Sequence, residues 1–141
     1  MRQEIGYTLS LDRTIANPNF GDSEITGVDF SNDAVSIRFK LFHADGSDFA
    51  VAVFIKDMRL FSLRATFGQN VIDTVKIFGS QDDAMLHGNQ FTRGVVGTLV
   101  DEQARMTRSF VPSTQYLVFE VNSVIDTDLV CVGSKIAMEH V

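Results

Sequence analysis

Two neighbouring segments, residues 34–42 and 49–57, constrain the fold of this chain more than any other feature of its sequence. In the first segment every second residue is apolar: Val35, Ile37, Phe39 and Leu41. Because successive side chains of a β-strand point to opposite faces, this alternation predicts a strand with one buried and one solvent-facing side. The second segment is apolar on both faces as far as Ile55, which is typical of a central strand. With the short polar loop between them, the two segments predict a β-hairpin.

Six further segments have the apolar pattern of strands, with turn residues between most of them. They are residues 5–11, 24–30, 58–67, 71–78, 115–124 and 129–138. The turn Gly68-Gln69-Asn70 predicts that the third and fourth of these form a second hairpin. Short strands at this regular spacing are typical of a sandwich or barrel. We therefore predict an all-β, mainly antiparallel single domain over residues 1–141, a β-sandwich or a flattened barrel with at most one or two short helices.

The composition supports a β fold. Val, Ile, Thr, Phe and Tyr together outnumber Ala, Leu, Glu, Lys and Gln, and the former group favours strands. The acidic residues are 13 Asp and only 5 Glu, and Asp favours turns because its side chain bonds to the nearby backbone. A chain of 141 residues that is 45% hydrophobic can bury a core without a disulfide or a structural metal.

Residues 90–111 have two competing interpretations. Thr98 and Asp101 resemble a capping box, and good helix formers follow them, so a short helix is the preferred prediction. The alternative is a hairpin that turns at Asp101-Glu102.

The alternation also predicts which side chains form the core. We expect a common core of Phe39, Val53, Phe54, Leu63, Val75, Phe119 and Val121. Cys131 lies in an apolar strand segment, where a buried thiol has a raised pKa and is inert. Asp73 is predicted on the apolar face of its strand, so it should be paired with an arginine or lie at a sheet edge.

The segment 129–138 predicts self-association. It has one lysine and no proline, so it would be poorly protected if it were an edge strand. On that ground we expect a homodimer that covers this strand around a two-fold axis.

Two polar clusters are the candidate ligand-binding residues. The first is the hairpin loop with His43, Asp45 and Asp48, and the second is the predicted loop with Asp82, Asp83 and His87. Carboxylates and an imidazole are ligands for a hard cation or groups for acid–base chemistry. However, Asp45-Gly46 is an ordinary tight turn and the spacing does not fit a calcium loop. We therefore predict no metal site, and solvated turns are the simplest explanation of both clusters.

Several classes of function are disfavoured by what the chain contains. There is no nucleophile elbow, no phosphate-binding loop and no dinucleotide fingerprint in the sequence, so no cofactor is expected. The net charge of −6 disfavours nucleic acid and anionic membranes as partners. The amino-terminal residues lack the apolar stretch of a signal peptide, and no segment is long enough to span a membrane. A cytoplasmic location is the expectation.

The remaining class is a non-enzymatic binding or interaction module. An acidic protein of this kind could bind a basic protein partner, as an immunity-type inhibitor does, because opposite charges speed encounter. The alternative is a small hydrolase or isomerase that uses the loop Asp and His residues. A deep pocket in which these side chains converge would favour the enzyme, and a flat acidic face with exposed aromatic rings would favour the binding module.

Overall fold

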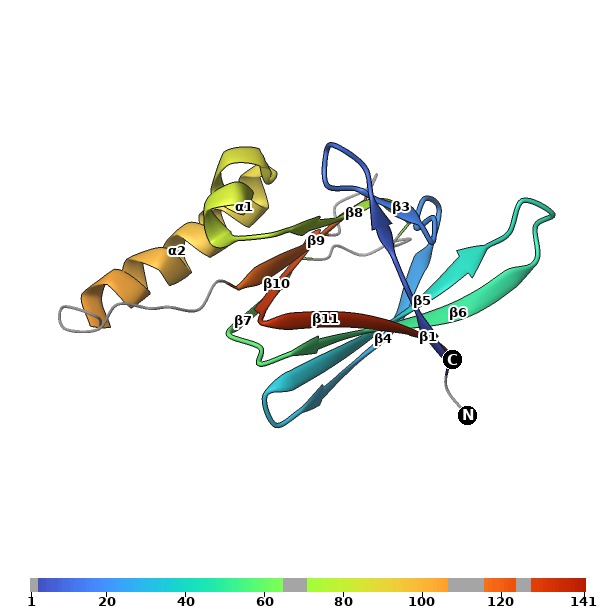
Figure 1. Ribbon diagram of the computed structural model, residues 1–141, viewed down its shortest axis with the longest axis horizontal. Coiled ribbons are helices and arrows are strands. Elements are labelled where there is room, and N and C mark those ends of the chain that lie inside the picture. The colour runs from blue at the N-terminus through green and yellow to red at the C-terminus, as the bar shows by residue number, and fades with distance from the viewer. Residues whose placement is uncertain (1–2, 65–70, 107–115, 124–127) are drawn as a thin grey trace.

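The computed structural model describes residues 3–64, 71–106, 116–123 and 128–141, and of residues 103–106 only the backbone (Figure 1). It shows the predicted β-sandwich, built from antiparallel strands with two helices. No helix in these described ranges combines the length and the apolar character that a membrane crossing requires.

Two sheets form the sandwich. The five-stranded sheet has the order β1 (Gln3–Ile5), β11 (Lys135–His140), β6 (Asp48–Lys56), β5 (Ala34–Phe42) and β4 (Glu24–Ser31). The four-stranded sheet has the order β7 (Leu60–Arg64), β10 (Asp128–Gly133), β9 (Leu117–Ser123) and β8 (Ile72–Phe78). A small hairpin of β2 (Thr8–Leu9) and β3 (Ile15–Asn17) lies beside them.

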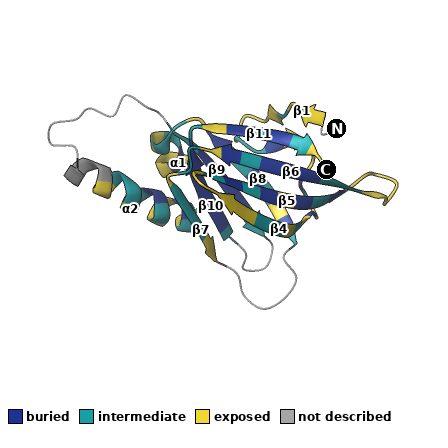
Figure 2. Ribbon diagram, turned by 90° about the horizontal axis from the view of Figure 1, so that it is seen from below, coloured by how far each residue is buried: buried dark blue, intermediate teal, exposed yellow. Residues whose placement is uncertain are grey.

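The first hairpin forms as predicted, because β5 and β6 pair from Val35↔Ile55 to Phe42↔Asp48. The alternating apolar side chains of β5 are all buried between the sheets. The body of both strands is buried and the tip of their hairpin is exposed (Figure 2).

Most of the predicted core is correct. Phe39, Val53, Val75, Phe119 and Val121 are buried in one cluster between the two sheets.

Phe54 and Leu63 are exceptions to the predicted core. Phe54 lies opposite Ser36 on the outer face of the five-stranded sheet and is only half-buried. Leu63 is 47% exposed, because β7 is an edge strand and has a neighbour on one side only.

The predicted second hairpin is wrong. β7 pairs with β10, and β8 pairs with β9, so the two segments lie at opposite edges of the four-stranded sheet. The turn residues 68–70 on which the prediction relied lie outside the described residues. Turn residues between two strands show that the chain changes direction, but they do not show which strands pair.

Residues 129–138 are not one strand but parts of two. The chain leaves β10 at Gly133 and enters β11 at Lys135, which belongs to the other sheet. Both strands have a neighbour on each side, so neither is an edge. The premise of the predicted homodimer, one edge strand over this segment, is therefore wrong, although β1 covers β11 only at residues 138–140; the homodimer itself stays a prediction.

Two helices cover the outer face of the four-stranded sheet. They are α1 (Gln81–His87) and α2 (Gln90–Met106), and their apolar side chains pack with Val118, Val130 and Val132 in a second core. Asp82 and Asp83 therefore lie on a helix and not in the predicted loop, because Ser80 caps α1 by accepting a hydrogen bond from the Asp83 amide.

The predicted helix in residues 90–111 is confirmed as far as Met106, and the hairpin alternative is wrong. The helix starts eight residues before the predicted Thr98 start, because Asn89 is the capping residue: its Oδ1 accepts a hydrogen bond from the Thr92 amide at 2.7 Å. Thr98 lies inside the helix and bonds back to the Gly94 carbonyl at 3.0 Å.

Asp73 is exposed at a sheet edge, one of the two places expected for it. The pairing of β8 with β9 shifts register between Ile72 and Thr74. This bulge allows Ile72 and Val75 both to be buried while Asp73 turns to solvent.

Candidate functional site

The two predicted polar clusters do not meet. His43, Asp45 and Asp48 lie at the tip of the β5–β6 hairpin, whereas Asp82, Asp83 and His87 lie on α1. The hairpin tip and α1 are at opposite ends of the molecule (Figure 1). The imidazoles of the two clusters therefore cannot act on one ligand.

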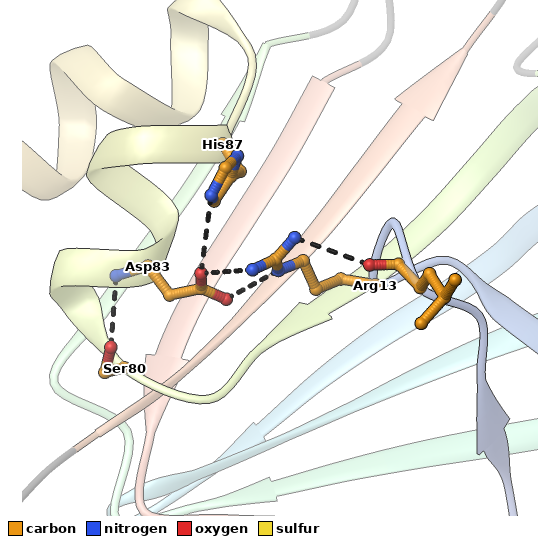
Figure 3. A network of polar contacts seen from close by, with 5 residues as sticks. Arg13, Ser80, Asp83 and His87 are labelled. Carbon is orange, nitrogen blue, oxygen red and sulfur yellow. Dashed lines mark hydrogen bonds and ion pairs between the residues drawn. The ribbon is translucent and has the colours of Figure 1, made fainter.

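The cluster on α1 is an ion pair that fixes the helix to the β2–β3 connection. The Arg13 guanidinium donates from Nε and Nη2 to the two carboxylate oxygens of Asp83, both at 2.8 Å (Figure 3). His87 Nε2 lies 4.0 Å from the same carboxylate, and Ser80 Oγ accepts from the Asp83 amide at 3.0 Å. Since Asp83 uses both oxygens on Arg13, this cluster is explained by the packing of α1 alone.

The hairpin loop is a closed turn. Asp45 Oδ1 accepts hydrogen bonds from the Ser47 hydroxyl at 2.6 Å and from the Ser47 amide at 2.9 Å. These bonds, the hydroxyl first, lower the pKa of Asp45 below its usual value. Gly46 has φ of 88°, a conformation that favours glycine. Asp45 and Asp48 are both exposed.

His43, at the base of this loop, lies in an aromatic cluster that includes a second histidine. Its ring stacks on Phe49 with the centroids 4.3 Å apart and the planes at 24°. The His140 ring lies 6.1 Å from Phe49 on another side, tilted by 52°. His140 reaches this place because β11 runs beside β6 and pairs His140 with Val51.

A cavity opens at this end of the sandwich, and we call it the hairpin-end pocket. Its volume is about 320 Å³. Its lining residues are Ile5, Gly6, Asn17, Pro18, Asn19, Phe42, His43, Phe49 and His140. Of the six candidate residues, only His43 lines it. The walls come from β1, the end of β3, the ends of β5 and β6 and β11, with the chain that follows β1, β3 and β5, so the pocket depends on contacts between distant parts of the sequence.

The electrostatic character of the hairpin-end pocket is set by groups at its rim. None of its lining residues is Lys, Arg, Asp or Glu. The loop that joins the lining residues His43 and Phe49 carries Asp45 and Asp48. On the outside of Phe42, which is 40% exposed, the Lys40 ammonium lies 5.5 Å from the ring centroid.

A second polar network lies under the start of α2. Thr74, Asn122, Asp128 and Arg64 are cross-strand neighbours that form one row over all four strands of the sheet. Asn122 donates to Thr74 at 3.2 Å and to Glu120 at 2.7 Å. Arg64 is paired with Asp128.

Asn89 joins this row to the helix. Its side-chain amide donates to Asn122 and to Asp128, and its backbone amide donates to Glu120 at 3.0 Å. Glu120 points outward from the sandwich, but it is only 1% exposed, because the helix covers it. The network supplies hydrogen-bond donors to the buried carboxylate of Glu120. This carboxylate lies at a helix N-terminus, where a negative charge is favourable. A cavity of about 370 Å³ lies nearby, lined by Arg64, Gln90, Phe91, Gly94 and Val95, and Asn89, Glu120 and Asn122 are not among its lining residues.

The sequence could not reveal Glu120, Asn122 or His140 as members of sites. Each was an unremarkable polar residue at the outer face or the end of a strand. Asn89 had the one usable signal, since Asn before an apolar helical pattern is a preferred capping residue.

The surroundings of Cys131 do not suit a nucleophile. The side chain is fully buried in β10, and burial raises the pKa of its thiol to about 12. The thiol is therefore protonated at any physiological pH, as predicted. Within the described ranges no three His, Cys, Asp or Glu side chains gather closely enough to hold a metal ion.

The chain shows no significant match to protein-family models, to curated proteins or to solved structures.

Proposed function

We propose that this protein is a non-enzymatic binding module that receives a cationic side chain of a basic protein partner in the hairpin-end pocket. One observation carries the proposal: an aromatic pocket whose lining contains no lysine or arginine is followed along the chain by a loop with two exposed carboxylates, Asp45 and Asp48.

The rings and the carboxylates have complementary roles in this proposal. Aromatic faces attract a cation that has been partly removed from water. The carboxylates of Asp45 and Asp48 are exposed, so they act mainly by steering the approach of a positive partner and add little to the affinity each. Against these two carboxylates, one positive charge lies beside the pocket, since the Lys40 ammonium lies over the ring of Phe42.

The pocket is the right size for one side chain. At about 320 Å³ it is at the lower end of small-molecule sites. Phe42, at its edge, is partly exposed, and exposed aromatic rings beside a polar rim are typical of the centre of a protein–protein interface. The separation of the two histidine clusters favours this function over a hydrolase or isomerase that combines them.

A nuclear magnetic resonance titration tests the proposal. The probe is a soluble peptide in which Lys and Arg alternate with Gly and Ser, added to the ¹⁵N-labelled protein at low salt. We expect saturable shifts at the amides of His43, Phe49 and His140, because these residues line the pocket.

The charge contribution is tested with a matched pair of variants. Asp45→Asn with Asp48→Asn should weaken binding by about 3- to 10-fold, and the Asn side chain keeps the oxygen that closes the turn. Asp101→Asn with Glu102→Gln changes the net charge equally, near the far end of α2, and should leave the affinity unchanged. Equal weakening in both variants, or shifts confined to another surface, would show the proposal to be wrong.

A further inference from the structure

We infer that the hairpin-end pocket selects arginine over lysine. The inference rests on the proposed function and names the side chain that the pocket takes. It follows from what the walls of the pocket contain and from what they lack.

The walls offer flat rings and side-chain amides, and no carboxylate. Four of the nine lining residues have aromatic rings: Phe42, His43, Phe49 and His140. The carboxylates of Asp45 and Asp48 are in the loop outside the lining. A cation in the pocket therefore gives up water without gaining a direct contact with a lining carboxylate.

This environment treats the two basic side chains differently. The lysine ammonium is compact and strongly hydrated, so it loses most when water is replaced by ring faces alone. The arginine guanidinium is planar and more weakly hydrated, and it stacks on aromatic faces. The loss of hydration is therefore smaller for arginine, and the gain from the rings is larger.

The arrangement of the rings also suits a planar group. His43 and Phe49 are already stacked, at 4.3 Å and 24°, so the pocket contains a layered pair to which a flat cation can add. The molecule uses the same contact internally, where Arg59 lies 5.3 Å above the Tyr116 ring and Arg64 lies 5.0 Å above the Phe91 ring.

The lining also contains two side-chain amides, Asn17 and Asn19, whose oxygens are hydrogen-bond acceptors. Asn19 Oδ1 accepts the Gly21 amide at 2.9 Å, and an amide oxygen has two lone pairs. The five N–H groups of a guanidinium lie in one plane and point in several directions. One guanidinium can therefore donate to more than one acceptor, which a single ammonium on a flexible stem does with less defined geometry.

The test uses three peptides that differ at one residue, which is Arg, Lys or citrulline in a neutral Gly/Ser background. Citrulline has the shape of arginine without its charge. Calorimetry with the full chain should show the Arg peptide binding about 3- to 10-fold more tightly than the Lys peptide, and the citrulline peptide more weakly than both.

Two variants on the same strand locate the effect. Phe49→Ala removes a ring of the pocket and should abolish the preference for Arg. Phe54→Ala removes another half-buried ring of β6 that lies outside the pocket. It controls for the loss of stability that truncating a ring causes, and the preference for Arg should be unchanged in this variant. His43→Ala, at an exposed position, gives a second test in case Phe49→Ala unfolds.

The outcomes separate the inference from the proposed function. If the Arg and Lys peptides bind equally and both shift the amide resonances of the pocket, the inferred preference for Arg is wrong and the cation site is supported. Absence of binding by both peptides, or citrulline binding as tightly as Arg, would overturn the cation site itself. If the preference for Arg persists in both Phe49→Ala and His43→Ala, the Arg side chain binds outside the pocket and the inference is wrong.

Discussion

Phe119 makes one of the aromatic contacts between the two sheets. Its ring lies 6.4 Å from Phe39 on the facing sheet, at 75°, and Phe39 in turn contacts Phe20 at 4.9 Å. The side chain is fully buried. Edge-to-face pairs of this kind add to the free energy that burial alone provides.

We expect Phe119→Ala to lower the free energy of unfolding by about 3 to 5 kcal/mol, because the neighbours can only partly fill the cavity. Chemical denaturation measures this loss. Leu63→Ala is the control, since Leu63 is 47% exposed and its truncation should cost much less. A loss under about 1 kcal/mol at Phe119 would contradict the position assigned to its ring.

At the scale of elements, the start of α2 is held by more than its cap. Asn89 satisfies the first turn of the helix through the Thr92 amide, and the same side chain donates to Asn122 and Asp128 on the sheet. Ser80 caps α1 with one bond to Asp83 and makes no such link among the hydrogen bonds described here.

The comparison of the two caps gives a prediction. Ser80→Ala should cost about 1 kcal/mol, the usual cost of losing a capping bond. Asn89→Ala should cost about 2 to 3 kcal/mol, because it also removes the side-chain hydrogen bonds to Asn122 and Asp128 and takes away the donor to Asn122 Oδ1. Denaturant unfolding of both variants checks the difference. Equal losses would mean that the contacts of Asn89 with the sheet contribute nothing to stability.

At the scale of the whole molecule, the two sheets are joined where the chain passes from β10 to β11. Gly133 lies at this crossing, and a Cβ atom there would be 2.5 Å from Ile55 Cγ2 and 2.7 Å from the Lys56 carbonyl oxygen. A backbone oxygen cannot move away without disturbing β6. The close approach of the sheets at this point therefore requires glycine.

Gly133→Ala should destabilise the fold by about 1 to 3 kcal/mol through overpacking. Gly94→Ala adds the same methyl group in α2, where a Cβ meets nothing within 4 Å, and should stabilise by up to about 1 kcal/mol because alanine favours the helix. Thermal melts of the two variants should shift in opposite directions. A melting temperature that stays the same or rises for Gly133→Ala would contradict this packing of the crossing.

The sequence by itself determined the class of fold, the first hairpin and the buried face of β5. These depend on alternation within nine residues and on a turn between neighbouring segments, so local geometry is enough to decide them. It also indicated a helix in residues 90–111, although Asn89 was not recognised as its start.

The tertiary structure alone decided which distant segments pair, where residues 129–138 divide between two sheets, and why Glu120 is buried. It also brought His140 beside Phe49 and kept His43 apart from His87. Each of these outcomes depends on contacts between residues far apart in the chain. A local pattern shows that a side chain will be covered, but the covering partner is chosen by the packing free energy of the whole molecule.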